Sequence, residues 1–212
     1  MDHWWQKIRN AFSTKPQPPP ATNRNPVSKA SNLDEAGQLL AKISGQPLRP
    51  FSTRDFGRDQ FTEARSVLVG AAQAEPLLAK IRNCLGPGLV AFIGTQNNLA
   101  KPRPQGVELV VGLGASQFDI LRIAASDAVN FNQTTEDIIK QLQAWDAAHG
   151  VNIFQAETDT VQMRLVTLPA DLNRFAQEVY EFCPDIVDQG VGTVEGLARE
   201  IGATRKILLW WD

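Results

Sequence analysis

The 212-residue sequence has few of the residues that build disulfide-held or metal-held frameworks. It contains two cysteines, Cys84 and Cys183, and neither belongs to a CxxC motif or to a Cys/His spacing. A disulfide framework and a zinc site are therefore not indicated, and we expect both thiols to be reduced. The two histidines are His3 and His149. A Cys/His catalytic pair in the body of the chain would have to use His149.

Motifs for membranes, phosphate groups and metals are also missing. The chain has no run of eighteen apolar residues and does not begin with an apolar signal region, which predicts a cytoplasmic protein. Neither "GPG" at 86–88 nor "GLGAS" at 112–116 has the spacing of a phosphate-binding loop, and no EF-hand or HExxH pattern occurs. We therefore predict no metal site and no cofactor.

The net charge of −2 conceals an uneven distribution. Residues 1–30 contain five basic residues and one acidic residue, a formal charge of +4, which leaves −6 for the other 182 residues. Phosphate contacts need a basic surface, so we do not expect this acidic body to bind nucleic acid. An acidic body instead suits a basic protein partner.

Residues 1–30 are predicted to form an amphipathic head helix and a proline-rich linker. Trp4, Trp5, Ile8 and Phe12 have the spacing of one helix face, and five prolines follow without apolar periodicity. The head could contact an anionic membrane surface, which would place the protein at the periphery of the inner membrane. The alternative is that it packs back on the body.

Residues 31–64 are predicted to form one helix and an irregular segment. Ser31, followed by Asp34 and Glu35, resembles a capping box, and an apolar stripe from Leu33 ends at Gly45. Residues 46–64 are rich in turn-forming and charged residues, and we predict that they are irregular.

Residues 65–212 are predicted to be the α+β body. A first unit consists of the strand "SVLVGA", a helix with Pro76 in its first turn, and the strands "LVAFIG" and "VELVVGLG". A second unit consists of a strand "FDILRIA", a helix capped by Thr134 or Thr135, and the strands "VNIFQAE" and "VQMRLVTL" around a "TDT" turn. Two further helices, the second capped by Thr193, and the strand "KILLWWD" follow.

The predicted order is therefore a tandem of βαββ units, the second extended to βαββααβ. This order predicts an α+β fold of the ferredoxin-like split kind, with helices packed on an antiparallel or mixed sheet.

The stretch "YEFCPDIVDQGVG" at 180–192 has an architectural interpretation and two catalytic ones. Pro184 ends the preceding helix, and the aspartates and glycines then build a loop before the next helix. In the first catalytic alternative Cys183 is a nucleophile, but a helix C-terminus should raise its pKa. In the second, Asp185 and Asp188, with Asp212, act as general acid and base or bind a divalent cation.

The terminal "WWD" is predicted to place Trp210 and Trp211 on opposite faces of a strand. One ring can belong to the core, and the other needs a helix layer, a subunit or a partner to cover it. Candidate partner-binding residues therefore cluster near the C-terminal strand: Asp185, Asp188, Gln189, Trp210, Trp211 and Asp212.

Three runs resemble a known family: "ILRIAASDAVNFNQTTEDIIKQLQAWDAAHG", "LPADLNRFAQEVYEFCPDIVDQGVGTVEGL" and the terminal "LLWWD". They are similar to the bacterial domain of unknown function 4253, whose hallmark is a Cys-Pro-Asp motif near the C-terminus, and the similarity covers roughly residues 65–212. The family has no assigned reaction, so the resemblance transfers no catalytic role to Cys183, Pro184 or Asp185. It implies a bacterial origin and an association with toxin and immunity loci.

These observations together predict a non-enzymatic binding protein, an immunity protein that neutralises a basic toxin or effector domain by occluding its active site. The alternative is an enzyme of unknown reaction that uses Cys183, Asp185 and Asp188. The sequence leaves the oligomeric state open.

Overall fold

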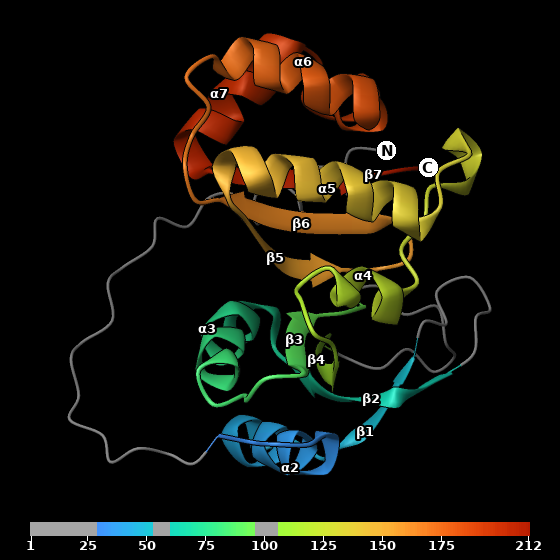
Figure 1. Cartoon of the computed structure of the whole chain (residues 1–212), viewed down its shortest axis with the longest axis vertical. Helices are drawn as coiled ribbons and strands as arrows, with labels where there is room; N and C mark the ends of the chain where they lie inside the picture. Colours follow the sequence, from blue (N-terminus) through green and yellow to red (C-terminus); the bar gives the residue numbers. More distant parts are fainter. Residues whose placement is uncertain (1–28, 53–59, 96–105) are drawn as a thin grey trace.

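The computed structural model describes residues 29–52, 60–95 and 106–212, which form an α+β fold with helices packed on a seven-stranded mixed sheet (Figure 1). The strand order is β1-β2-β4-β3-β5-β6-β7. The β3–β5 pair is parallel and the other neighbouring pairs are antiparallel. The predicted α+β class and mixed sheet are confirmed.

The strands are β1 (Arg49–Ser52), β2 (Gln60–Val69), β3 (Leu89–Ile93), β4 (Val107–Leu113), β5 (Val151–Ala156), β6 (Thr160–Leu165) and β7 (Lys206–Trp210). The helices are α2 (Leu33–Ser44), α3 (Ala71–Arg82), α4 (Asp119–Ala124), α5 (Thr135–His149), α6 (Leu172–Phe182) and α7 (Val194–Thr204). Two short helical turns are η2 (Val129–Phe131) and η3 (Ile186–Val191). No helix in the described ranges is long and apolar enough to cross a bilayer.

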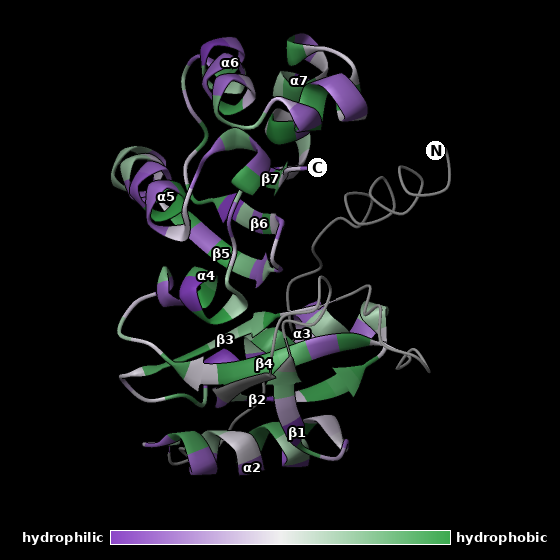
Figure 2. Ribbon diagram, turned by 90° about the vertical axis from the view of Figure 1, so that its right-hand side faces the viewer, coloured by the Kyte–Doolittle hydropathy of each residue, from purple (hydrophilic) through white to green (hydrophobic). Residues whose placement is uncertain are grey.

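Two hydrophobic cores lie on opposite faces of the sheet. Strand β3 contributes Ala91 and Ile93 to the core under α2 and α3, and Val90 and Phe92 to the core under α4–α7. This alternation follows from the period of two in a strand, and burial on both faces explains the nearly continuous apolar run "LVAFI". Figure 2 shows mainly hydrophobic colouring along β3 and β4, and mixed colouring on α2 and α7.

The two halves of the sheet meet at β3 and β5, where the parallel register contains one residue pair, Ile93 with Gln155. Arg82, the last residue of α3, reinforces this junction. Its guanidinium donates to the Ala91 carbonyl at 2.8 Å on one strand, and to the Asn152 side chain (2.8 Å) and the Ile153 carbonyl on the other. Arg82 therefore replaces part of the missing hydrogen-bond ladder with side-chain donors.

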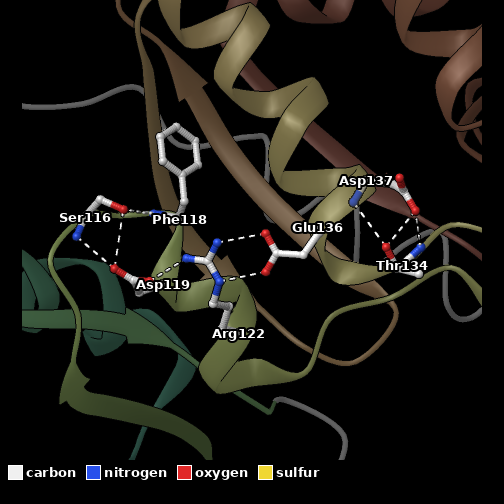
Figure 3. A network of polar contacts seen from close by, with 7 residues as sticks. All are labelled: Ser116, Phe118, Asp119, Arg122, Thr134, Glu136 and Asp137. Atoms are coloured by element: carbon white, nitrogen blue, oxygen red, sulfur yellow. Dashed lines mark hydrogen bonds and ion pairs between the residues drawn. The ribbon is translucent and has the colours of Figure 1, made fainter.

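Several predicted helix ends are confirmed. Thr134 caps α5 and forms a capping box with Asp137, which Figure 3 shows beside the α4–α5 contact. Gly45 ends α2 in a left-handed conformation with φ of 67°, Gly150 ends α5, and Thr193 caps α7. The predicted strands of the body are also found, except "FDILRIA".

The segment "FDILRIA" was predicted to be a strand, and this prediction is wrong because it contains helix α4. Four of the six residues of α4 are buried, so the helix has no broad polar face and its apolar run resembles a strand. Arg122 on the exposed side binds Asp119 at 2.6 Å and Glu136 of α5 at 2.8 Å, which joins the two helices (Figure 3). The second unit thus lacks its first strand, and this sheet does not show the ferredoxin-like split order.

Two other local predictions need correction. Within residues 46–64, which were predicted to be irregular, the described parts contain β1 and the beginning of β2. Pro76 lies inside α3 and not in its first turn, because the helix already begins at Ala71 after Gly70. Asn32, one residue after Ser31, is the N-cap of α2.

Candidate functional site

The Cys-Pro-Asp motif lies where α6 ends, and we call residues 183–192 the CPD loop. Cys183 is the C-cap of α6, and the chain then forms the π-helical turn η3 before it reaches Gly192. Gly192 has a φ of 84°, in the left-handed region that favours glycine. Thr193 begins α7, so the loop is a stop and restart between two helices that pack together.

The thiol of Cys183 is engaged with the backbone of β7. Its Sγ donates to the Trp210 carbonyl at 3.0 Å and accepts from the Trp210 amide at 3.3 Å. The side chain therefore takes the place that a neighbouring strand would have beside the outer edge of β7. This arrangement protects an edge strand from pairing with another chain.

The pKa of the Cys183 thiol is raised to about 12, mainly by burial and to a smaller extent by the nearby charge of Asp185. Hydrogen bonds with the Trp210 and Ile186 backbones oppose this rise. A higher pKa was predicted from the helix C-terminus, but the main cause is burial, since the residue is fully inaccessible. A thiol in this state is a poor nucleophile.

Asp185 is a buried carboxylate that ties the CPD loop to the residue after Trp211. One oxygen accepts from the Asp212 amide at 2.9 Å, and the other accepts from the Gln189 side chain at 3.0 Å. Asp185 is 8% exposed. Both of its oxygens are thus used to shape the loop.

Asp188 and Tyr180 form a separate, more exposed contact. The Tyr180 hydroxyl donates to Asp188 at 3.2 Å, and this hydrogen bond raises the pKa of Tyr180. The loop therefore brings Asp185, Gln189 and Asp212 together, while Asp188 points to a different partner.

An aromatic cluster supports the loop from the core side. Trp145 packs edge-on against Phe175 and Phe182, and Phe182 packs edge-on against Trp211 at 5.8 Å between ring centroids. His149 contacts the Phe175 ring and shares no contact with Cys183 among those found in the described ranges. Trp211 is buried and Trp210 is half-buried, as expected for one core ring and one outer ring.

A cleft of about 220 Å³ lies next to the CPD loop, at the β5–β6 turn. Of the residues predicted for the site it includes Trp211 and Asp212, and its lining does not include Cys183, Asp185, Asp188 or Gln189. The cleft is lined by Asp127, Ala128, Val129, Asn130, Thr158, Asp159, Trp211 and Asp212.

Three segments meet at the cleft and are fixed to one another by hydrogen bonds. The Ser126 hydroxyl donates to the Glu157 carbonyl at 2.6 Å, and the Asp127 amide donates to the Thr158 carbonyl at 2.9 Å. The Trp211 amide donates to the Asp159 carbonyl at 3.1 Å. The three segments that form the walls of the cleft are therefore held in place by hydrogen bonds to backbone carbonyls.

Sequence reasoning missed the contribution of Asp127, Thr158 and Asp159. The "TDT" motif carries Thr158 and Asp159, and it was interpreted only as a turn. Asp127 follows α4, which was predicted to be a strand. The available signal was the recurrence of aspartate in two loops, but the strand order that brings those loops together was not predictable.

Trp4, Trp5, Ile8 and Phe12 of the predicted head lie outside the described residues. Within the described ranges, no group of three or more His, Cys, Asp or Glu side chains has the arrangement of a metal site.

Together these features define a class of α+β domain in which a Cys-Pro-Asp loop closes one edge of the sheet. Residues 109–212 match one family model, described as Domain of unknown function (DUF4253), so this part of the chain is a DUF4253 domain. The family predicted from the sequence is thus confirmed, but the match begins inside β4 at residue 109 and does not extend over the predicted range of 65–212. No curated protein and no solved structure matched the sequence significantly.

Proposed function

We propose that the DUF4253 part of the chain is a non-enzymatic binding module for a basic protein. The observation that carries this proposal is the cleft beside the CPD loop, where three aspartates lie around a small hollow with the exposed side chain of Val129. Exposed apolar groups next to charged ones are common where proteins bind each other. The formal charge of −6 on residues 31–212 would steer a basic partner toward this surface.

In this proposal the CPD loop is the support of the binding surface. It fixes Trp210 through Cys183 and Asp212 through Asp185, so the end of β7 is held before a partner arrives. Preorganised surfaces lose less conformational entropy on binding. Asp188 and Gln189, which are exposed on the same loop, would extend the contact area.

The specific form that we propose is an immunity protein, which neutralises a basic bacterial effector by occluding its active site. The support is the acidic charge of residues 31–212, together with the association with toxin and immunity loci that the family resemblance implies. The alternative, an enzyme that uses Cys183, Asp185 and Asp188, has weaker support. Cys183 is buried, Asp185 is committed to the loop, and none of the three lines the cleft.

The test is co-expression of the full chain with each protein encoded beside it in its native genome. We expect one basic neighbour to form a stoichiometric complex, and we expect cells that express both proteins to survive the toxicity of that neighbour. Association should slow as salt is raised, since steering between charges is screened. The absence of any complex together with the absence of protection would overturn the proposal.

The matched variants for this test are Asp127→Asn with Asp212→Asn, and Glu63→Gln as the control. Glu63 is exposed on β2, outside the cleft. Asp127→Asn alone, which removes one negative charge as the control does, should weaken the complex, and the double variant should weaken it further, whereas Glu63→Gln should not. Equal weakening by Asp127→Asn and Glu63→Gln would mean that net charge, and not the cleft, determines binding.

A further inference from the structure

The cleft has chemical features that specify what it would hold. Its polar lining includes Asp127, Asp159 and Asp212, of which Asp159 accepts a hydrogen bond from the Thr160 hydroxyl at 2.9 Å, and its apolar lining includes Val129, which is 68% exposed. Carboxylates in this number favour a cation, and the apolar wall favours an aliphatic stem. Arginine and lysine side chains combine the two.

Besides the aspartates and Val129, the lining includes two residues, Thr158 and Trp211, whose side chains each carry a polar atom without a hydrogen-bond partner in the described ranges. Thr158 and Trp211 are each 4% exposed, and neither the Thr158 Oγ1 nor the Trp211 Nε1 has a hydrogen-bond partner in the part of the chain that the structure describes. A buried donor that has no acceptor destabilises the fold. Both residues line the cleft, but the two atoms have almost no solvent-accessible surface, so an acceptor oxygen at the base of the cleft restores these bonds only if the lining shifts to admit it.

The size of the cleft limits the occupant. Pockets for drug-sized molecules usually measure about 300–1,000 Å³. The volume of about 220 Å³ here is smaller, and it suits one long side chain with its backbone carbonyl. A peptide segment supplies both a cationic head group and such a carbonyl oxygen.

We propose that this cleft is an anchor site for a single arginine of a partner protein. The guanidinium pairs with the carboxylates of Asp127, Asp159 and Asp212, the stem packs on Val129, and the adjoining carbonyl accepts from Thr158 or Trp211. Arginine fits better than lysine because its planar fork can bind two carboxylate oxygens at once and is more weakly hydrated. The inference rests on the proposed function and names the chemistry of the partner.

The experiment uses the full chain, labelled with ¹⁵N, and a capped Gly-Arg-Gly peptide as the probe. The readout is the indole N–H signal of Trp211, assigned with the variant Trp211→Phe among the five tryptophans. We expect the signal to shift in a saturable way, with a dissociation constant on the order of 1 mM, as is typical of a single weak anchor. The matched peptide with citrulline, a neutral isostere of arginine, should leave the signal unchanged.

Variants of the full chain test whether the arginine peptide binds at the cleft. Asp127→Asn should weaken arginine-peptide binding about fivefold, the upper range for a solvent-accessible ion pair, and Glu63→Gln should not change it. Equal shifts with arginine and citrulline, or no saturable shift with either, would overturn the inference. A shift that appears only after Lys7→Glu and Arg9→Glu are introduced would also overturn it, because the occupant would then be the basic head of the same chain.

This result is independent of the co-expression test. A protein complex that forms although the peptide does not bind would contradict the arginine anchor and leave the proposed function standing. A peptide that binds although no neighbouring protein forms a complex would support the cleft chemistry and contradict the binding of a basic neighbour.

Discussion

The two halves of the sheet differ in where their helices pack. Helices α2 and α3 cover the half made by β1–β4 on one face, and α4–α7 cover β5–β7 and part of the centre on the other face (Figure 1). The first half consists largely of apolar packing under two helices. The second half adds side chains that bind backbone groups at its edge, as in the CPD loop.

This difference indicates which half carries the recognition surface. The cleft, the CPD loop and the exposed Val129 all belong to the second half and its connections. The first half is joined to it by one parallel residue pair and by α3, from which Arg82 binds β3 and β5 and Glu75 binds Lys206 at 3.0 Å. The first half thus supports the second without contributing a residue to the cleft.

The junction between the halves should be the most sensitive point. Arg82→Met removes a charged donor from three acceptors and leaves two strand carbonyls short of a partner. We expect a loss of about 3 kcal/mol in the free energy of unfolding. Urea unfolding followed by circular dichroism would measure it, and Lys80→Met, an exposed change on the same helix, is the control. A loss equal to that of the control would mean that the strands alone hold the halves together.

The pH dependence of the free energy of unfolding should show that the Cys183 thiol, in the second half, is buried and neutral. The folded pKa of this thiol is raised to about 12 from an ordinary value of about 8.5, so folding is favoured while the group is protonated. That stability is complete below about pH 8.5 and is lost as the pH rises toward 12. At pH 10.5, two pH units above the ordinary pKa, the wild-type chain should have lost about 3 kcal/mol that Cys183→Ser does not lose.

The control for this titration is Cys84→Ser, which changes the other thiol and should follow the wild-type curve. Denaturant unfolding at each pH measures the difference. Parallel curves for the wild-type chain and Cys183→Ser would contradict the buried, neutral thiol.

Substitutions of the two aspartates of the CPD loop should have different effects on the free energy of unfolding. Asp185→Ala removes the acceptor of the Asp212 amide and of Gln189, so it should cost about 1–2 kcal/mol. Asp188→Ala removes one exposed contact with Tyr180 and should change the unfolding free energy by less than about 0.5 kcal/mol. Thermal unfolding of both variants gives the comparison, and the reverse order would show that the loop is held from its exposed side.

The smallest effect is expected at the exposed network between α4 and α5. Arg122→Gln breaks the pairs with Asp119 and Glu136. Hydrogen bonds from Arg122 hold the pKa of Glu136 below its usual value, but exposed pairs contribute little to stability. We expect a decrease in Tm of about 1–2 °C at low salt that disappears in 1 M NaCl. A decrease that persists in salt would indicate a packing role for the Arg122 stem.

Local patterns predicted most of the fold. The capping residues Thr134 and Thr193, the helix-ending Gly45 and Gly150, and the strands of the body were recognisable because each depends on nearby residues. The helix α4 was not recognisable, since burial on several sides removes the polar face that marks a helix. The placement of α2 and α3 opposite α4–α7 depends on strand order, which periodicity does not contain.

The candidate site was predictable only in part. The end of an α-helix before Pro184 follows from proline geometry, and Asp185 was a natural loop residue. The bonds from Cys183 to Trp210 and from Asp185 to Asp212 join positions 27 residues apart in sequence. Such contacts depend on the position of β7, and the meeting of Asp127 with Asp159 in the cleft depends on how the loop after α4 packs against the β5–β6 turn.

Thiol alkylation of the folded full chain tests the architectural role of the CPD loop most directly. With iodoacetamide at pH 8 and peptide mapping by mass spectrometry, the half-buried Cys84 should be modified, whereas Cys183 should stay unmodified until the chain unfolds. At a pKa of about 12, only about one Cys183 thiol in ten thousand is ionised at this pH. Alkylation of Cys183 in the folded protein at a rate equal to or above that of Cys84 would contradict the account and favour a reactive cysteine.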